Sequence, residues 1–444
     1  MEYQVEEISP IKKKVNVTIS VDKVDQALEK ALNAYVSDVQ LKGFRKGKAP
    51  KAMLKSRFKK EIHNEATTEL VRRHVDEIMA EIKLEPVSPY QFDGQEVEEG
   101  QPYTFSYQFE IMPVIDLPDY TNMEVKQAKA EVTNKDIDTL IDNMRKSMAK
   151  AEDIDEDRPP QDGEAALVSM KTYLDGKEIP SLSGDNFEAR LGAGHMLPAI
   201  EALIKKTARG QSSEEDISIP EDFRDKNLAG KTVHVKLTAH SVRKLVLPEV
   251  DADFAKAAGQ FESVEKMRET IEQSFLKSRA NIHKAAAQKR LIDALLEKTA
   301  FPLPQYMAEE RLENNLHEFL DNLKKRGGTW EDLDEKTQEQ VKIELTRNAN
   351  EFVRESLFLQ AVAAKEGLEV TQVDFNEFFS STAMRAGRNP QELRRHFEEQ
   401  NLMSGLRIRL LVGKALELLY DKAKVTEVPD SELEEKDEDE KNEE

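Results

Sequence analysis

The sequence predicts a multidomain α+β protein with an N-terminal α+β domain, a small β-rich domain and an elongated all-α C-terminal domain with arms. Three observations support this prediction. The chain has 444 residues, enough for roughly two to four domains that each bury a core. Charged residues make up 34% of it, against a usual share of about 25%, which suits a long, helix-rich molecule better than one globule. The pattern of apolar residues also changes near residue 150 and again near residue 247.

The first 112 residues predict one α+β domain. The segments "KKVNVTIS" and "YTFSYQFEIM" alternate apolar and polar residues, as half-buried strands do. Between them, apolar residues at helical spacing predict helices over Val24–Val36, Lys51–Phe58 and Ile62–Ile82. Turn-forming glycine and proline residues separate the first two helices, so an exposed loop is expected there.

Residues 113–150 predict a linker, and residues 151–246 predict a second domain. The linker begins with the proline-rich segment "PVIDLPDY", and Thr133 followed by Asp136 is the capping-box pattern of a helix start. Short alternating segments then follow: "ALVSMKTYLDG", "NFEARLGAG", "EEDISIP" and "KTVHVKLTAHSV". One helix is expected among them, over Pro198–Lys205. Residues 151–246 therefore predict a small β-rich domain.

Residues 247–426 predict a domain that is almost entirely helical. The apolar pattern of residues 263–298 is long enough for an arm of about ten helical turns. Three further helix starts are indicated by capping residues: Thr329 with Asp332, Thr371 with Asp374, and Asn389 before Pro390.

Charge is distributed unevenly along the chain. The net charge is −21, and residues 427–444 hold eleven acids and two lysines, a net of −9 that leaves −12 on the rest. Such a segment repels itself and has little to bury, so a disordered acidic tail is expected. In contrast, residues 42–60 contain nine lysines and arginines and no acid.

Several classes of protein are excluded by what the sequence lacks. The N-terminal "MEYQVEEISP" is not a signal peptide, and no apolar run approaches the roughly 18 residues of a membrane span, so a cytoplasmic protein with no membrane partner is expected. There are no cysteines and no phosphate-binding G-x-x-x-x-G-K-[ST] motif. His234 and His240 would lie about 20 Å apart along a strand, too far to share a metal ion. We therefore expect neither a metal nor another cofactor.

The basic segment contains "GFRKGKAP", which allows three interpretations. It could be a glycine-rich turn that happens to be basic. It could contact RNA, with lysines at phosphates and Phe44 stacked on a base. It could also be a loop tip that docks on a protein partner.

The same stretch fits G-F-R-x-G-x-x-P, the ribosome-binding signature of the trigger factor family of bacterial chaperones, and the chain resembles that family over its whole length. "LVSMKTYLDGKEI", "LGAGHMLPAIEALI" and "IPEDFRDKNLAGKTVHVKL" are similar to FKBP-type prolyl isomerase segments. "DKAKVTE" before an acidic end is similar to the family's C-terminus. The resemblance implies a ribosome-binding domain (1–112), a linker packed with the C-terminal domain (113–150), an FKBP-type domain (151–246) and a helical domain that cradles clients (247–426).

The resemblance also implies a docking site in the basic loop. Phe44 would be an apolar anchor, Arg45 would offer donors to a carboxylate of an exit-tunnel protein, and nearby lysines would meet ribosomal RNA phosphates. The residues that it assigns to ribosome binding are Gly43, Phe44, Arg45, Lys46, Gly47 and Pro50.

For the FKBP-type domain, the resemblance places Phe187, Met196, Leu197 and Phe223 in the catalytic pocket. Other positions depart from the family pattern because they lack its aromatic or acidic residues: Met170, Ile179, Pro180, Ile200 and Val233. Since the pocket works by surrounding the prolyl bond with aromatic walls, reduced isomerase activity is expected.

The implied partners are the ribosome and unfolded nascent chains, bound without ATP. Candidate client-binding residues on the C-terminal helices are Phe352, Phe358, Phe375, Phe378, Phe379, Met384, Phe397 and Met403. Any single one of them is expected to be a core residue more often than a client-binding one, because apolar stripes on helices usually belong to a core. Two alternatives stay open: a protein that acts mainly as a prolyl isomerase, and an RNA-binding protein that uses the basic loop. A homodimer away from the ribosome is also left open.

Overall fold

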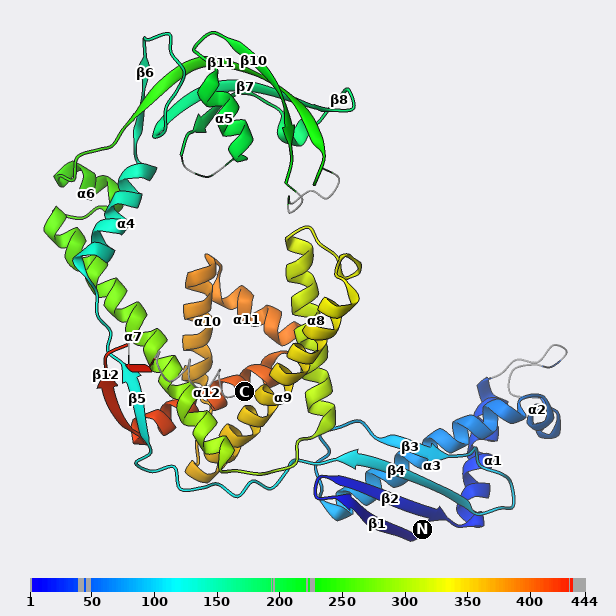
Figure 1. Cartoon of the computed structure of the whole chain (residues 1–444). Coiled ribbons are helices and arrows are strands. Elements are labelled where there is room, and N and C mark those ends of the chain that lie inside the picture. Colours follow the sequence, from blue (N-terminus) through cyan, green and yellow to red (C-terminus); the bar gives the residue numbers. More distant parts are fainter. Residues whose placement is uncertain are drawn as a thin grey trace. The chain divides into compact units, whose positions relative to one another are not determined.

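The computed structural model describes most of the chain: residues 2–38, 44, 49–192, 194, 196–220, 223, 228–430 and 432–433. Its contacts divide the chain into two units, which are described separately (Figure 1). The first unit comprises Met1–Val125, Gln288–Asn322 and Trp330–Val425. The second comprises Lys126–Ala287, Leu323–Thr329 and Thr426–Glu444. None of the described helices is long and apolar enough to cross a lipid bilayer.

The N-terminal part of the first unit is an antiparallel sheet in the order β1-β2-β4-β3. Its strands are β1 (Glu2–Ser9), β2 (Lys12–Ile19), β3 (Gln91–Gly94) and β4 (Tyr103–Glu110). The two strands predicted from alternation are β2 and β4, and both are confirmed. Every second residue of β4 is buried, which produces a row of aromatic rings on one face: Tyr103, Phe105, Tyr107 and Phe109.

Three helices accompany this sheet, close to the predicted ranges: α1 (Val21–Asp38), α2 (Lys51–Arg57) and α3 (Lys59–Ile82). Apolar residues of α1 and α3 form one core with the aromatic face of the sheet. Leu28 and Ala31 contribute from α1, and Leu70 and Ile78 from α3. The predicted α+β fold is therefore confirmed for this part of the chain.

The linker follows with strand β5 (Glu124–Ala128) and helix α4 (Asn134–Ser147). The predicted capping box is present, since the Asp136 amide donates to Thr133 Oγ1 at 3.3 Å and the Thr133 amide donates to Asp136 Oδ2 at 2.9 Å. Before β5, the buried Tyr120 hydroxyl donates to Glu366 at 2.6 Å. Burial and that hydrogen bond raise the pKa of Tyr120 to about 12.

The β-rich domain in the second unit has six strands: β6 (Lys150–Ile154), β7 (Glu164–Leu174), β8 (Lys177–Glu178), β9 (Gly184–Arg190), β10 (Ser212–Ser218) and β11 (Thr232–Val246). They pair in the order β10-β11-β7-β8, with β6 added to β11 and β9 to β7. A 3₁₀ turn (Pro180–Leu182) and helix α5 (Pro198–Lys206) complete it, and α5 confirms the helix predicted there. Figure 1 shows α5 on one side of the strongly curved sheet.

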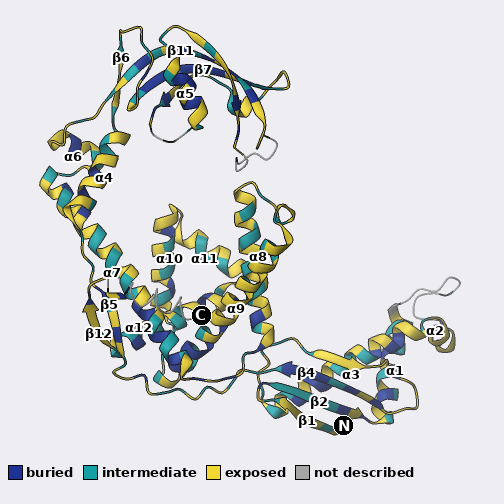
Figure 2. Cartoon of the chain, in the orientation of Figure 1, coloured by how far each residue is buried: buried dark blue, intermediate teal, exposed yellow. Residues whose placement is uncertain are grey.

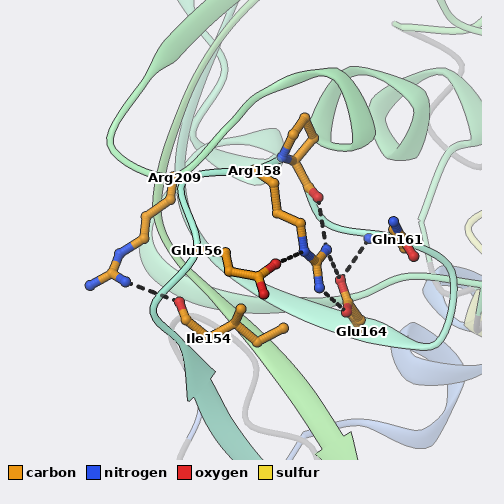
Figure 3. A network of polar contacts seen from close by, with 7 residues as sticks. Ile154, Glu156, Arg158, Gln161, Glu164 and Arg209 are labelled. Carbon is orange, nitrogen blue, oxygen red and sulfur yellow. Dashed lines mark hydrogen bonds and ion pairs between the residues drawn. The ribbon is translucent and has the colours of Figure 1, made fainter.

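The two ends of this domain lie side by side. Strand β6 enters and β11 leaves, and their register places Lys150 opposite Val246. The loop after β6 is fixed by Arg158, which binds Glu164 through two hydrogen bonds of 2.8 and 2.6 Å and Glu156 through one of 2.9 Å (Figure 3). Hydrogen bonding to Glu164 raises the pKa of the Arg158 guanidinium, so the charged pair is favoured at all ordinary pH values.

Two more helices belong wholly or partly to the second unit: α6 (Ala252–Gly259) and α7 (Val264–Glu297). The 34-residue α7 confirms the predicted long helix. Its first turns pack with α4 and α6 around a small core: Ile137, Ile141, Phe254, Met267 and Ile271.

The remaining helices are α8 (Gln305–Lys325), α9 (Glu335–Glu366), α10 (Gln372–Ala386), α11 (Pro390–Glu399) and α12 (Met403–Lys422). The predicted starts at Thr371 and Asn389 are confirmed by their caps. The start predicted at Thr329 is wrong, because Trp330–Asp332 is a 3₁₀ turn and the cap of α9 is Asp334.

The first residues of the segment expected to be a disordered tail are ordered. Strand β12 (Lys424–Val428) extends past residue 427, and Val428 and Leu433 are buried together with Ala128. The last residues, 434–444, lie outside the described part of the chain.

Candidate functional site

The described part of the basic loop shows that Phe44 packs against its own domain. The ring is half-buried and contacts a cluster formed by Ala49 and Leu54, with Leu32, Val36 and Phe58 around it. Phe44 was expected to be exposed at a loop tip. Instead, it packs against residues of the C-terminal half of α1, of α2 and of the junction between α2 and α3.

The other predicted docking residues are divided between described and undescribed parts of the chain. Pro50 is the N-cap of α2, with φ −61° and ψ 131°, values that its ring favours. Gly43, Arg45, Lys46 and Gly47 lie outside the described residues. Beyond Pro50, the cations of the basic segment are all exposed on α2 and the start of α3: Lys51, Lys55, Arg57, Lys59 and Lys60.

Three of the eight client-binding candidates are core residues. Phe358 on α9 is fully buried, and Phe375 and Phe379 on α10 are almost so. Phe375 and Phe379 share a cluster with Leu406 of α12. The prediction that these three phenylalanines offer a binding surface is therefore wrong, because they pack between helices.

The other five candidates reach the surface to different degrees. Phe352 is 50% exposed and Met384 is 83% exposed, while Phe378, Phe397 and Met403 are half-buried around the α10–α12 cluster. The Arg311 guanidinium lies 4.1 Å from the Phe352 ring centroid, a cation–π contact that covers one face of the ring. Exposed residues are frequent along α8, α10 and α11 (Figure 2).

Several exposed apolar residues of the C-terminal helices are missing from the candidates, among them Ile282, Tyr306, Ile343, Val373 and Ile408, and Leu402 is exposed at the N-cap of α12. Their helical position carries the signal. In α9 the buried stripe has a spacing of four, through Ala349, Val353 and Leu357. Ile343 is six residues before Ala349, or about 240° around the helix, so it cannot lie on that stripe.

Helix α10, which carries Met384, is held at its start by charge. Asp374 accepts from the Thr371 amide at 2.6 Å and from Lys414 Nζ of α12 at 2.7 Å. The Lys414 hydrogen bond, followed by those from Thr371, lowers the pKa of Asp374 from 3.8 to about 2. The ion pair therefore joins α10 to α12 at neutral pH.

The four pocket candidates of the β-rich domain lie at the edge of one core. Phe187 on β9, Met196 and Leu197 before α5, and Phe223 after β10 are each half-buried against the same apolar cluster. The structure thus brings together residues that are up to 36 positions apart in the sequence. Parts of the two loops around them, residues 193, 195, 221–222 and 224–227, lie outside the described residues.

Below these residues the core is aliphatic. Met170, Ile200 and Val233, which stand where the resemblance implies aromatic residues, are all buried in that cluster. Ile179 is half-buried beside it, and Pro180 begins the 3₁₀ turn. The buried residues of this cluster that the structure describes include no aromatic ring.

Comparison with known proteins identifies the relatives of this chain. Residues 1–144 match the family model described as bacterial trigger factor protein, and residues 263–421 match that of the trigger factor C-terminus. The trigger factor of Oleidesulfovibrio alaskensis is 40% identical over 97% of this chain and 98% of its own. That of Solidesulfovibrio magneticus is 40% identical over 96% and 97%.

A solved structure supports the fold. It is described as "Promiscuous Substrate Recognition in Folding and Assembly Activities of the Trigger Factor Chaperone" and covers 94% of this chain and 99% of that one, with a TM-score of 0.54 and 21% identity. At that identity the likeness concerns the fold alone. The multidomain α+β architecture, the two family models and the full-length relatives agree, and this chain belongs to the trigger factor family.

Proposed function

We propose that this protein is an ATP-independent chaperone that docks at the ribosomal peptide exit and holds nascent chains, and that its FKBP-type domain has reduced prolyl isomerase activity. The proposed division of labour follows the predicted domains, 1–112 for docking, 113–150 with 247–426 for holding, and 151–246 for isomerisation. The observation that carries the proposal is the set of exposed apolar side chains on the C-terminal helices, Phe352 and Met384 above all.

Docking is supported by the exposed cations of α2 and α3. In an acidic protein they form a local basic patch, which would steer the N-terminal domain toward RNA phosphates. The acidic remainder of the chain would be repelled by the same phosphates. The packing of Phe44 adds to this. Because its ring already packs against residues of α1 and α2, the Phe44 side chain would lose less conformational freedom on docking than an unpacked side chain.

Holding is supported by the scattered exposure of the C-terminal apolar residues. Burying one Leu or Phe side chain is worth about 1.5–3 kcal/mol, and a micromolar complex needs about 8 kcal/mol. Several weak contacts can together supply that free energy, and each can be released separately. A client that folds buries its own apolar groups, so release needs no nucleotide.

Reduced isomerase activity is supported by the aliphatic residues beneath the pocket candidates. Rigid aromatic walls would exclude water from the prolyl bond and favour its twisted state. Met170, Ile200 and Val233 fill this core without supplying such walls. The domain would then bind proline segments weakly.

The docking proposal is tested by co-sedimentation with ribosomes. The double variant Arg45→Ala/Lys46→Ala removes two charges beside Phe44 and leaves the packed ring in place. We expect at least a tenfold loss of ribosome-bound protein. A matched control is Arg72→Ala/Arg73→Ala, which removes two exposed charges from α3 outside the basic segment. Undiminished co-sedimentation of the first variant, or an equal loss in both, would end the docking assignment.

A further inference from the structure

A groove lies between helix α3 and strand β3 in the N-terminal domain. Its volume is about 500 Å³, and its walls include Val71 and Val75 from α3 and Tyr90 and Phe92 from the β3 side. Phe92 pairs with Tyr107 in the strand register, and their ring centroids are 6.0 Å apart. Phe92 therefore lies on the face of the sheet that packs on helices elsewhere, yet it is 54% exposed. Phe92 is thus an aromatic residue on the core-facing side of the sheet that no other part of the domain fully covers.

The backbone beside this groove belongs to an edge strand. Strand β3 is the last in the order β1-β2-β4-β3 and pairs only with β4 within the described residues. An edge strand has N–H and C=O groups that can pair with another extended chain. The opposite edge strand, β1, carries three glutamates in eight residues, and none of its residues lines the groove.

Charges around the groove are mostly negative. Asp76, Asp93 and Glu96 line it and are exposed, and Arg72 is the cation among the lining residues. Arg72 is already engaged, since its guanidinium donates to Glu69 at 2.9 Å. The groove therefore has an apolar wall and an acidic rim, whereas α2 of the same domain is strongly basic.

We propose that this groove binds an extended peptide segment, with apolar side chains at alternate positions and a lysine or arginine at its ends. The segment would add to β3 as a fifth strand, so that every second side chain points toward Val71, Val75 and Phe92. The acidic rim would favour its basic ends. The inference rests on the proposed holding function in one respect, since it takes unfolded clients as the natural source of such segments.

The test uses fluorescence anisotropy with the full chain and three short labelled peptides. The first alternates valine and threonine and has lysine at both ends. The second has glutamate at both ends, and the third is the lysine peptide with N-methylated valines. We expect the glutamate and the N-methylated peptides to bind at least fivefold more weakly. Equal binding of all three would overturn strand addition at an acidic groove.

Variants locate the site. Phe92→Ala should weaken binding of the lysine peptide severalfold, and Asp76→Lys/Asp93→Lys, which changes only exposed side chains, should reverse the preference for lysine over glutamate ends. Val5→Ala, an exposed apolar residue of β1, is the matched control. An unchanged preference in the charge variant, or an equal loss in Val5→Ala, would overturn the proposal.

The same titration separates this site from the proposed holding surface. Phe352→Ser/Met384→Ser should leave binding of the lysine peptide unchanged, because neither residue lines the groove. If that double variant loses the peptide while Phe92→Ala keeps it, the groove proposal fails and the holding surface stands. If aggregation of a client is not suppressed by the wild-type chain but Phe92→Ala still loses the peptide, the holding proposal fails and the groove stands.

Discussion

The C-terminal helices and the inserted β-rich domain use similar apolar residues in different ways. On the helices, eight candidates divide into buried, half-buried and exposed residues, and the two most exposed, Phe352 and Met384, are on separate helices. In the β-rich domain, four candidates are all half-buried at the edge of one cluster. The helices thus expose separate apolar residues, whereas the β-rich domain gathers its candidates at one place. Under the proposed function, the first arrangement would suit varied clients and the second a single prolyl bond.

The largest expected effect is the loss of stability when a buried phenylalanine of the C-terminal helices is truncated. We expect Phe358→Ala to lower the free energy of unfolding by about 3–5 kcal/mol, because it opens a cavity in a fully packed core. Phe352→Ala should cost under about 1.5 kcal/mol, since its ring is half in water and loses mainly the Arg311 contact. Urea unfolding followed by Trp330 fluorescence measures both. Trp330 is the only tryptophan and lies against Phe319 of α8 and Lys342 of α9. Equal losses would refute the division into core and surface.

The proposal for the β-rich domain is tested by measuring prolyl isomerase activity. We expect prolyl isomerisation by the full chain to be at least tenfold slower than that of an ordinary FKBP-type domain, a difference of about 1.4 kcal/mol in transition-state stabilisation. The remaining activity should fall further in Phe223→Ala, because this ring is one of the aromatic groups at the cluster edge. Magnetisation exchange on a proline tetrapeptide measures the rate without a protease. A rate equal to that of ordinary FKBP-type domains would refute the argument from the aliphatic core.

The smallest expected effect on stability concerns the ion pair between Asp374 of α10 and Lys414 of α12. Asp374→Asn keeps a hydrogen-bond acceptor for Thr371 and removes the ion pair with Lys414. The folded-state pKa of Asp374 is about 2, below its ordinary value of 3.8, so its stabilisation is present above pH 3.8 and is lost as pH falls toward 2. Wild type should therefore be the more stable protein at pH 5, and the difference should shrink by pH 3. A difference that grows on acidification would contradict this sign.

Local sequence signals predicted the secondary structure well wherever a cap was unambiguous. Thr133 with Asp136 and Thr371 with Asp374 both form the expected capping boxes. Near the start of α9 two patterns compete, Thr329 with Asp332 and Asp334 with Thr337, and the second forms the cap. Nothing in the local sequence decides between them, and in the structure Trp330, the first residue of the 3₁₀ turn, packs against the distant Phe319.

The candidate sites were harder to predict because they depend on contacts between distant segments. Phe375, Phe379 and Ala383 follow one another at intervals of four residues and are buried on one face of α10. Applying that spacing to the sequence would have assigned the two phenylalanines to the core and Met384 to the surface. No such rule exists for Phe44. Its burial requires α1 and α2 to approach each other, and a loop sequence rich in glycine and lysine does not show this. Leu433, an isolated apolar residue among acids, is buried against Ala128 for the same reason.

The central claim is that clients are held by the C-terminal helices and not by the inserted domain. Deleting residues 151–246 tests it directly, because Lys150 and Val246 face each other in adjacent strands and the ends can be joined there. Suppression of aggregation of an unfolded client, measured by light scattering, should persist in the deletion variant. It should fall severalfold in Phe352→Ser/Met384→Ser, which leaves that domain intact. Loss of suppression in a folded deletion variant, together with full suppression by the double variant, would place the client surface in the inserted domain and contradict the claim.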